Sequence, residues 1–382
     1  MNALDGIVVA DFSRVLAGPY ATMLLGDLGA EVVKVERPGS GDDTRSWGPP
    51  WRGEQSTYFA SVNRNKSSVT LDLSDPDDLA RARALAERAD VLVENFKPGA
   101  FDRLGLGYQS LSEANPGLVY CSISGFGTAG GADLAGYDLL VQAVGGLMSI
   151  TGSSPDEPVK VGVALVDVIT GLHAAVGVLA ALHERESSRR GQRVEVNLLS
   201  SLLSGMVNQS SGYVGAGFVP GIMGNRHPSI APYESYPTAD RPMVIAVGND
   251  RQFRSCATVL GRPEWADDPR FATNPARVEN RLELFELMCR QLSAKGAETW
   301  FAELSGVGVP CGPIHDVAGA FQLAERLGLA PVADAAGEPT VANPIGLSRT
   351  PPTYRTPPPA LGTSGLDAAG QLVDPEEPEG PT

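Results

Sequence analysis

The chain has 382 residues, enough to bury a sizeable core and to form more than one structural unit. It carries 30 Lys and Arg against 45 Asp and Glu, and the formal net charge of −15 argues against a nucleic-acid-binding protein. Apolar residues make up 42% and charged residues 20%, as is ordinary for a globular protein.

The first half of the chain alternates between strand and helix patterns. Short β-branched runs at 6–13 and 31–39 flank a helical pattern at 18–30, which together form a βαβ unit. The following elements are strands at 69–73, 90–96 and 118–126 and a helix at 75–89. This alternation predicts an α/β fold, namely a Rossmann-like large domain with a parallel sheet.

The second half contains a long helix and then a change of character. The segment 161–185 is apolar almost all round in its helical part, which predicts a buried helix. A strand at 242–250 and helices near 251–260, 277–294 and 296–305 predict a smaller α/β domain. The domains expected are a large domain at 1–200, a linker helix region at 201–225, a small domain at 226–325, a return segment at 326–365 and a flexible acidic tail at 366–382.

Several classes of site and location are disfavoured by what the sequence lacks. The N-terminus has no signal-peptide pattern, and no run of about 18 uninterrupted apolar residues occurs, so we expect a cytoplasmic protein without a membrane span. The four cysteines form no CxxC pair, and with the four histidines they show no metal-ligand spacing. We therefore predict no metal and no permanently bound cofactor. A GxSxG motif is also missing, which disfavours a serine hydrolase.

The first βαβ unit is a candidate phosphate site, because a helix N-terminus follows its first strand. The turn reads SRVLAGP rather than GxGxxG, which makes a nicotinamide site a weak interpretation. Arg37, beyond the second strand, suits a ribose phosphate, although a surface ion pair is an equal alternative. Lys66, Lys97 and Arg103 add positive charge at strand–loop junctions, which modestly favours an anionic ligand.

Asp167 stands out because it lies in the apolar run VGVALVDVITGL at the expected start of the long helix. A carboxylate in apolar surroundings is costly unless something compensates its charge. The helix N-terminus supplies unsatisfied N–H groups and a positive dipole end, so an ordinary N-cap is one interpretation. A catalytic nucleophile kept ionised by the helix is the other, and both can hold at once.

The chain resembles the class III CoA-transferases in the segments DFSRVLAGPYATMLLGDLGAEVVKVERPGSGDDTR, NRNKSSVTLDL, DVLVENFKPGAFDRLGLGY, LVYCSISGFG, AGYD and VGVALVDVITGLHAAVGVLAALHERE. The resemblance runs from about residue 4 to residue 362. Three further segments, GDDTRSWGPPW, STYFASVNRNK and Asn225–Ser235, are most similar to the branch that transfers CoA to dicarboxylates such as glutarate.

The resemblance implies an interlaced homodimer, acyl-CoA and a small carboxylic acid as substrates, and an aspartate nucleophile that falls on Asp167. It implies an aspartyl-CoA thioester as the intermediate and suggests succinyl-CoA as donor. By the same match, the residues that would hold CoA are Leu16, Ala17, Arg37, Leu71, Asp72, Leu73, Ser74, Asn95, Phe96, Lys97, Arg103, Ala135, Tyr137 and Asp138.

Some positions depart from the family's patterns. Tyr137 stands where the racemases of the family carry a catalytic His, so racemase is a minor alternative. The segment 224–233 replaces a glycine-rich loop, which makes formate and oxalate poor substrate candidates, and GFGTAGGAD and LGTSG are altered family motifs. An inactive acyl-CoA-binding paralogue is a third possibility, which the presence of Asp167 disfavours. For a second substrate carboxylate, the candidates are Arg45, Arg64 and Arg226, with His227 as a neutral donor.

Overall fold

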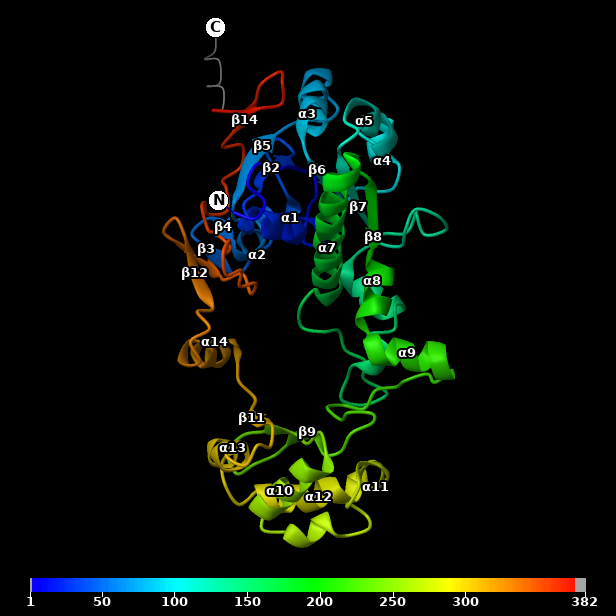
Figure 1. Cartoon of the computed structure of the whole chain (residues 1–382), viewed down its shortest axis with the longest axis vertical. Helices are drawn as coiled ribbons and strands as arrows, with labels where there is room; N and C mark the ends of the chain where they lie inside the picture. Colours follow the sequence, from blue (N-terminus) through cyan, green and yellow to red (C-terminus); the bar gives the residue numbers. More distant parts are fainter. Residues whose placement is uncertain (1, 375–382) are drawn as a thin grey trace. The chain divides into compact units, whose positions relative to one another are not determined.

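The computed structural model describes residues 2–374, and Figure 1 shows the course of the chain. The described residues form two compact units. The first unit contains the residues up to 147, residues 161–218 and those from 330 onward, and the second contains 148–160 and 219–329. The sequence placed 148–160 in the large domain, but these residues pack with the second unit. A Cβ added to Gly152 would lie 3.2 Å from Ile222, which shows how closely the two segments approach.

A six-stranded parallel sheet forms the centre of the first unit. Its strands are β1 (Val8–Asp11), β2 (Glu31–Glu36), β5 (Lys66–Thr70), β6 (Val91–Glu94), β7 (Val119–Ser124) and β8 (Arg193–Asn197). The order is β5-β2-β1-β6-β7-β8, and every neighbouring pair is parallel. The prediction of a parallel α/β sheet is therefore confirmed. The winding reverses between β1 and β6, which is where a doubly wound sheet opens a crevice for ligands.

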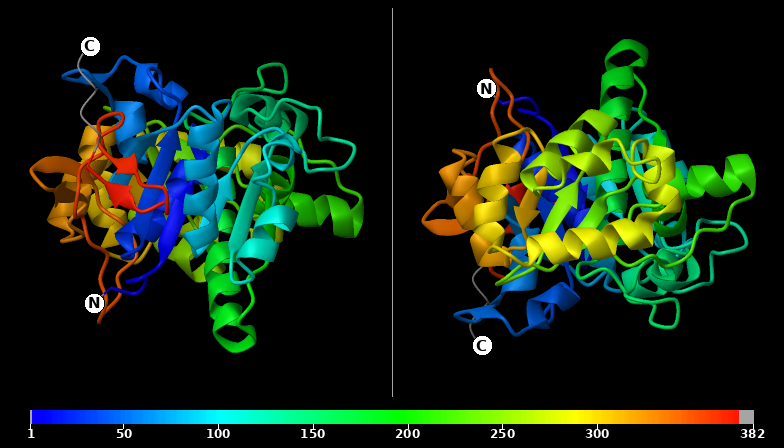
Figure 2. Two further views of the ribbon diagram at one scale, coloured as in Figure 1. Left: turned by 90° about the horizontal axis from the view of Figure 1, so that it is seen from above. Right: turned by 90° about the horizontal axis from the view of Figure 1, so that it is seen from below.

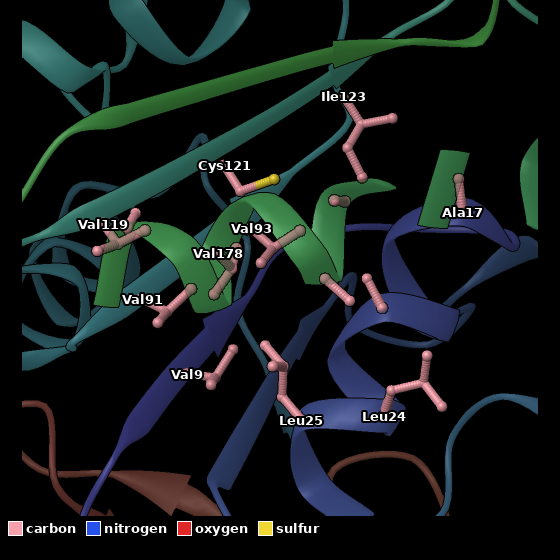
Figure 3. Close-up of a cluster of buried hydrophobic side chains, with 14 of the residues drawn as sticks. Val9, Ala17, Leu24, Leu25, Val91, Val93, Val119, Cys121, Ile123 and Val178 are labelled. Atoms are coloured by element: carbon pink, nitrogen blue, oxygen red, sulfur yellow. The ribbon is translucent and has the colours of Figure 1, made fainter. Parts of the chain in front are cut away.

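Helices cover both faces of this sheet. On one face, α1 (Ala17–Asp27) and α7 (Leu165–Ser188) bury Leu24, Leu25 and Val178 against the strands (Figure 3). On the other face lie α3 (Pro76–Arg88), α4 (Ala100–Arg103) and α5 (Tyr108–Ala114). Successive strand residues alternate between the two cores, so both faces are apolar and the strands read as continuous β-branched runs.

Shorter elements complete the first unit. They are η1 (Asp43–Ser46), β3 (Trp51–Arg52), β4 (Gln55–Ser56), α2 (Thr57–Ser61), α6 (Asp138–Val144), α8 (Leu198–Gly205), α9 (Val207–Ala216), β12 (Val332–Ala335), β13 (Glu338–Val341), β14 (Gly365–Leu366) and β15 (Leu372–Val373). Ser364 bridges to Val69, and Leu366 is buried, so the hairpin β14–β15 lies beside β5 (Figure 2, left, red). The flexible tail expected from residue 366 is thus wrong for 366–374, while 375–382 lie outside the described residues.

The second unit has its own core and its own sheet. The antiparallel order is β11-β10-β9, formed by β9 (Tyr233–Tyr236), β10 (Met243–Ala246) and β11 (Cys311–Pro313). Its helices are η2 (Met148–Ile150), α10 (Asp250–Val259), η3 (Pro263–Ala266), α11 (Asn274–Glu279), α12 (Arg281–Leu292), α13 (Ala297–Ser305) and α14 (Val317–Arg326). The single helix expected at 277–294 is two helices, because Asn280 leaves the helical conformation between them.

Among residues 2–374, α7 is long and apolar enough to span a membrane by length and composition alone. This is weak evidence for a span, since the core helix of a soluble protein passes the same test. Thr170, Ala174 and Val178 of α7 are buried in the first unit, but Leu172 and Val176 are exposed, so the predicted burial of this helix holds for one face only.

A buried network of charged side chains connects the carboxyl end of β1, the strand β2 and the first residue of β5. Lys66 contacts Asp11 at 3.0 Å, and Lys34 contacts Asp42 at 2.9 Å, with all four side chains excluded from solvent. Burial lowers the pKa of Lys66 to about 8 although Asp11 acts to raise it. For Asp11, burial acts to raise the pKa, but Lys66 and Lys34 hold it below its usual value.

This network corrects the sequence prediction for Lys66. The sequence placed Lys66 on a loop before a strand at 69–73, whereas it is the first residue of β5. Its ammonium donates to Asp11, to the Pro19 carbonyl and to Asn63, which satisfies all three protons. A lysine in a buried strand has no local sequence signal, because its partners come from other elements.

We predict that Lys66→Met lowers the free energy of unfolding by about 3–5 kcal/mol, because it leaves Asp11 buried without its closest cation. Urea denaturation followed by circular dichroism measures the loss. The matched control is Arg83→Met on the exposed surface of α3, where the ion pair with Glu87 is worth about 0.5 kcal/mol or less. Equal losses in the two variants would contradict the role given to Lys66.

Candidate active site

Two cavities lie beyond the carboxyl ends of the strands, around the point where the sheet reverses its winding. The first has a volume of about 430 Å³ and is lined by residues that follow β1, β2 and β5. The second has a volume of about 420 Å³ and is lined by residues that follow β1, β6 and β7 and by the start of α7. Arg14 and Phe96 line both cavities, so the two spaces share a wall.

The shared wall is held by contacts from both sides. The Arg14 guanidinium lies 4.8 Å from the centre of the Phe96 ring. Asn95 accepts from the Arg14 backbone N–H at 2.9 Å and donates to the Arg14 carbonyl at 2.7 Å. The carboxylate of Asp42 accepts from the Val15 N–H at 3.2 Å, which supports a left-handed conformation at φ 69°. The turn between β1 and α1 is therefore fixed at the boundary between the cavities.

Asp167 lines the second cavity from the first turn of α7, but it is not the N-cap of this helix. The cap position is Ala164, and Asp167 is the third residue of the helix. Asp138 performs the capping instead: one of its oxygens accepts from the N–H of Val166 at 2.8 Å and from that of Asp167 at 3.3 Å. The N-cap interpretation of Asp167 is thus wrong, and the helix end is satisfied by a residue 28 positions away from Val166.

The environment of Asp167 opposes its ionisation. Burial, and to a lesser extent the nearby charge of Asp138, raises the pKa of Asp167 to about 7. The sequence analysis expected the helix N-terminus to keep this carboxylate charged. Because the first-turn N–H groups of Val166 and Asp167 donate to Asp138, their favourable interaction goes to that neighbour rather than to the Asp167 side chain. A perturbed carboxyl group in a cavity is a typical feature of a catalytic site.

The structure brings together nearly all residues that the sequence analysis had assigned to CoA. The first cavity is lined by Arg37, Leu71, Asp72, Leu73, Ser74 and Phe96. The second is lined by Leu16, Ala17, Asn95, Phe96, Lys97, Ala135, Tyr137 and Asp138. Arg103 is the exception: it is exposed at the end of α4 and lines neither cavity.

A family model for CoA-transferase family III matches residues 4–364. This chain belongs to CoA-transferase family III. Succinyl-CoA:glutarate CoA-transferase of Mus musculus is 42% identical to it over 86% of this chain and 75% of the mouse protein. Succinate--glutarate CoA-transferase of Agrobacterium fabrum is 40% identical over 97% of this chain and 95% of its own length. The chain is thus an enzyme that transfers CoA between an acyl-CoA and an acid.

A crystal structure of a CAIB/BAIF family protein from Brucella suis has the same fold. It superposes with a TM-score of 0.85 at 42% sequence identity, covering 95% of this chain and 97% of the Brucella protein. CoA thioesters are the substrates of such transferases, so the two cavities at the sheet reversal are the candidate site for the thioester.

Two residues suggested for a substrate carboxylate are engaged elsewhere in the transferase. Arg45 contacts Glu36 at 2.6 Å and lies 3.8 Å from the centre of the Phe59 ring. Arg64 is buried against Asp27 at 2.6 Å. Neither lines a cavity that contains Asp167, so the assignment of these two arginines to the substrate is wrong in this structure. Their partners lie 9 and 37 residues away along the chain, which the sequence alone did not reveal.

The other two suggested residues belong to the second unit. Arg226 contacts Glu234 at 3.5 Å. His227 packs on Tyr233 with ring centres 5.1 Å apart, and its ring nitrogen accepts from the Ser229 N–H at 3.1 Å. Their role toward a substrate stays a prediction.

The sequence analysis missed Arg14. This residue borders both cavities, and its side chain contacts Asp43 at 3.8 Å. A usable signal was present, because Arg14 occupies the turn after the first strand of the βαβ unit, where phosphates bind in this class of fold. Because the turn lacks the GxGxxG motif, the sequence analysis assigned the phosphate to Arg37 instead.

We predict that Asp167→Asn stabilises the protein at alkaline pH. The pKa of Asp167 rises from 3.8 to about 7 on folding, so the native state keeps a proton that the unfolded state loses over this interval. The wild-type carboxyl group therefore reduces stability progressively as the pH rises from about 4 to 7. Removing it should raise the free energy of unfolding by about 1–3 kcal/mol above pH 8 and by little at pH 4.

Denaturation in urea at pH 4, 6 and 8 measures this pH dependence. Asp156→Asn, at an exposed position, is the control that changes the net charge equally. A stability gain for Asp167→Asn that is the same at all three pH values would contradict a raised pKa.

Proposed function

We propose that this transferase moves CoA from succinyl-CoA to a C4–C6 dicarboxylate through a thioester on Asp167. The observation that carries the proposal is the position of Asp167, whose partly buried carboxyl group lines a cavity that cationic residues border. The glutarate-using relatives support the choice of donor and acceptor. The acceptor class is also what the sequence segments 41–51 and 56–66 suggest.

The proposed chemistry begins with attack of the Asp167 carboxylate on the thioester carbonyl of the donor. The C–S bond breaks, CoA leaves as a thiolate, and a mixed anhydride joins Asp167 to the acyl group. The thiolate then attacks the Asp167 carbonyl of the anhydride, which releases the donor acid and leaves an aspartyl-CoA thioester. The acceptor carboxylate repeats these two steps in reverse, and no net proton is consumed.

The two cavities suit the two ends of a CoA thioester. We place the phosphorylated ribose in the first cavity beside Arg37, because a guanidinium matches phosphate oxygens in pairs. The pantetheine arm would pass Arg14 and Phe96 into the second cavity and bring its sulfur to Asp167. Since the exchange of one thioester for another is nearly neutral in energy, the main task of the site is positioning.

We further propose an interlaced homodimer, as the resemblance to the family implies. Exposed apolar side chains on and beside α9 support a partner surface in the described chain, since they are unusual on a solvated helix. These residues are Val207, Tyr213, Val214 and Phe218. Light scattering of the purified protein should give twice the chain mass, and a monomer would contradict the proposal.

Hydroxylamine trapping tests the nucleophile. Incubation of the enzyme with succinyl-CoA and hydroxylamine should convert Asp167 to a hydroxamate, which peptide mass spectrometry detects as a shift on residues around 167. Asp167→Asn should lose at least about 10³-fold in kcat, because it removes the covalent step. Asp133→Asn, also on the cavity wall, is the matched control that should keep the hydroxamate on Asp167.

Two results together would favour an inactive acyl-CoA-binding paralogue. These are an unmodified Asp167 and the absence of CoA transfer to any acid in a panel of C2–C6 mono- and dicarboxylates. Exchange of the α-hydrogen of a 2-methylacyl-CoA with solvent deuterium would instead favour a racemase. Tyr137, which lines the cavity, stands where the racemases of the family carry a catalytic His, and this disfavours a racemase.

We predict a rate that rises with pH through about 7, since only the ionised Asp167 can attack and its pKa is raised to about 7. Asp138→Asn keeps an oxygen that can cap α7 but removes the neighbouring negative charge. The rising limb of kcat/KM should therefore move to lower pH in this variant. A limb that does not move would show that the titrating group is not Asp167.

A further inference from the structure

Three cations line the two cavities among the described residues, and each is held by a carboxylate of the chain. Arg37 is hydrogen-bonded to Asp43, and Arg14 contacts the other oxygen of Asp43 at 3.8 Å. Lys97 contacts Asp133 at 2.9 Å. Two acidic side chains thus contact all three cations on the cavity walls and offset part of their charge.

The other charged residues on the cavity walls are acidic, so the three cations are the groups that can attract phosphate. Glu36, Asp42, Asp72, Asp138 and Asp167 also line the two cavities. Glu36 and Asp42 are neutralised by Arg45 and Lys34, which lie outside the cavity walls. A CoA molecule carries three phosphate groups and meets an acidic surface unless cations are released to it. The ion pairs of Asp43 and Asp133 are the ones that can release them.

The Arg14 side chain carries a hydrogen-bond donor that could bind an anion. Its Nε is buried and has no hydrogen-bond partner, although a buried donor is costly when left unpaired. The contact to Asp43, at 3.8 Å, is longer than a hydrogen bond. Phe96 holds the Arg14 guanidinium at the boundary of the cavities, so this guanidinium is preorganised for an anionic ligand. Asp43 satisfies it only in part.

The two carboxylates differ from the buried acids in their freedom to move. The backbone of Asp43 is held because Asp42 caps η1 and its N–H donates to Glu36 at 2.9 Å. The Asp43 side chain is nevertheless 44% exposed. Asp133 is 94% exposed and lies in a glycine-rich loop. The stems of this loop touch at Gly125 and Gly136, where an added Cβ would lie 2.4–2.5 Å from the opposite Cα.

We propose that Asp43 and Asp133 are placeholder anions, which hold Arg14, Arg37 and Lys97 in place in the empty enzyme and are displaced by the phosphates of CoA. This inference rests on the proposed CoA site. Displacement breaks the ion pairs of both carboxylates for each molecule bound, which weakens the affinity for CoA, while the pairs keep the cations ordered in the empty enzyme. Asp43 and Asp133 thereby favour release of CoA products at the end of the cycle.

Isothermal titration of the full-length enzyme with CoA tests the placeholder role. Asp43→Asn and Asp133→Asn should each lower the Kd by about two- to fivefold, which is the range expected for loss of an exposed ion pair. In steady-state assays, Asp43→Asn and Asp133→Asn should lower the KM for succinyl-CoA. Glu113→Gln, at an exposed position of α5 outside both cavity walls, controls for the change in net charge.

Arg37→Ala separates this inference from the CoA site on which it rests. A weaker Kd in Arg37→Ala, with no tightening in Asp43→Asn and Asp133→Asn, would overturn the placeholder role and keep the site. An unchanged Kd in Arg37→Ala would overturn both. Weaker binding in the two Asp variants would mean that the carboxylates only support the cations. Melting curves of each variant show that the fold is retained.

Discussion

The buried ion pairs of Lys66 with Asp11 and of Lys34 with Asp42 are the constraint on which the site depends. Asp11 is the last residue of β1, and the hydrogen bonds of this network reach the turn that follows the strand. Lys34 donates to the Ser13 carbonyl at 2.9 Å, and Asp42 accepts from the Val15 N–H. Asp11 accepts from the Ser13 N–H at 3.0 Å. The turn that separates the two cavities therefore cannot move without disturbing charges in the core.

The topology of the sheet explains why the functional groups meet. Parallel strands bring their carboxyl ends to one edge, and the reversal between β1 and β6 leaves room there for a ligand. The helix α7 then adds Asp167 from a different part of the chain, because its apolar side packs on the same sheet. Asp138 connects this helix to α6, and it influences the neighbouring carboxyl group through both its hydrogen bonds and its charge.

Electrostatics set two opposing demands on this enzyme. The whole chain is acidic, yet its substrate is a polyanion, so the few cations on the cavity walls must be kept available. The proposed nucleophile, Asp167, must be ionised to attack a thioester, yet burial and Asp138 oppose its ionisation. A nucleophile with a raised pKa is more basic and attacks more readily once it is ionised. Exposed, reversible ion pairs and a raised pKa are compatible with turnover, since both permit the site to change its charge state.

Much of the fold followed from local patterns. Runs of β-branched residues at 31–39, 90–96 and 118–126 indicated buried parallel strands, because both faces of such strands are apolar. The apolar stretch after Asp167 indicated the buried helix. The resemblance to a family added the residues expected to hold CoA, and all of these except Arg103 line the cavities.

Only the tertiary structure decided how the charged residues are used. The sequence does not distinguish Lys66, Arg45 and Arg64 from cations that are free to bind a ligand. In the structure, each forms an ion pair with a buried carboxylate from another element. The cap of α7 depends on Asp138, which lies far away along the chain, and burial together with the charge of Asp138 raises the pKa of Asp167. The physical reason is that hydrophobic periodicity is a local property of the sequence. The pairing and the desolvation of charges depend on neighbours that only folding brings together.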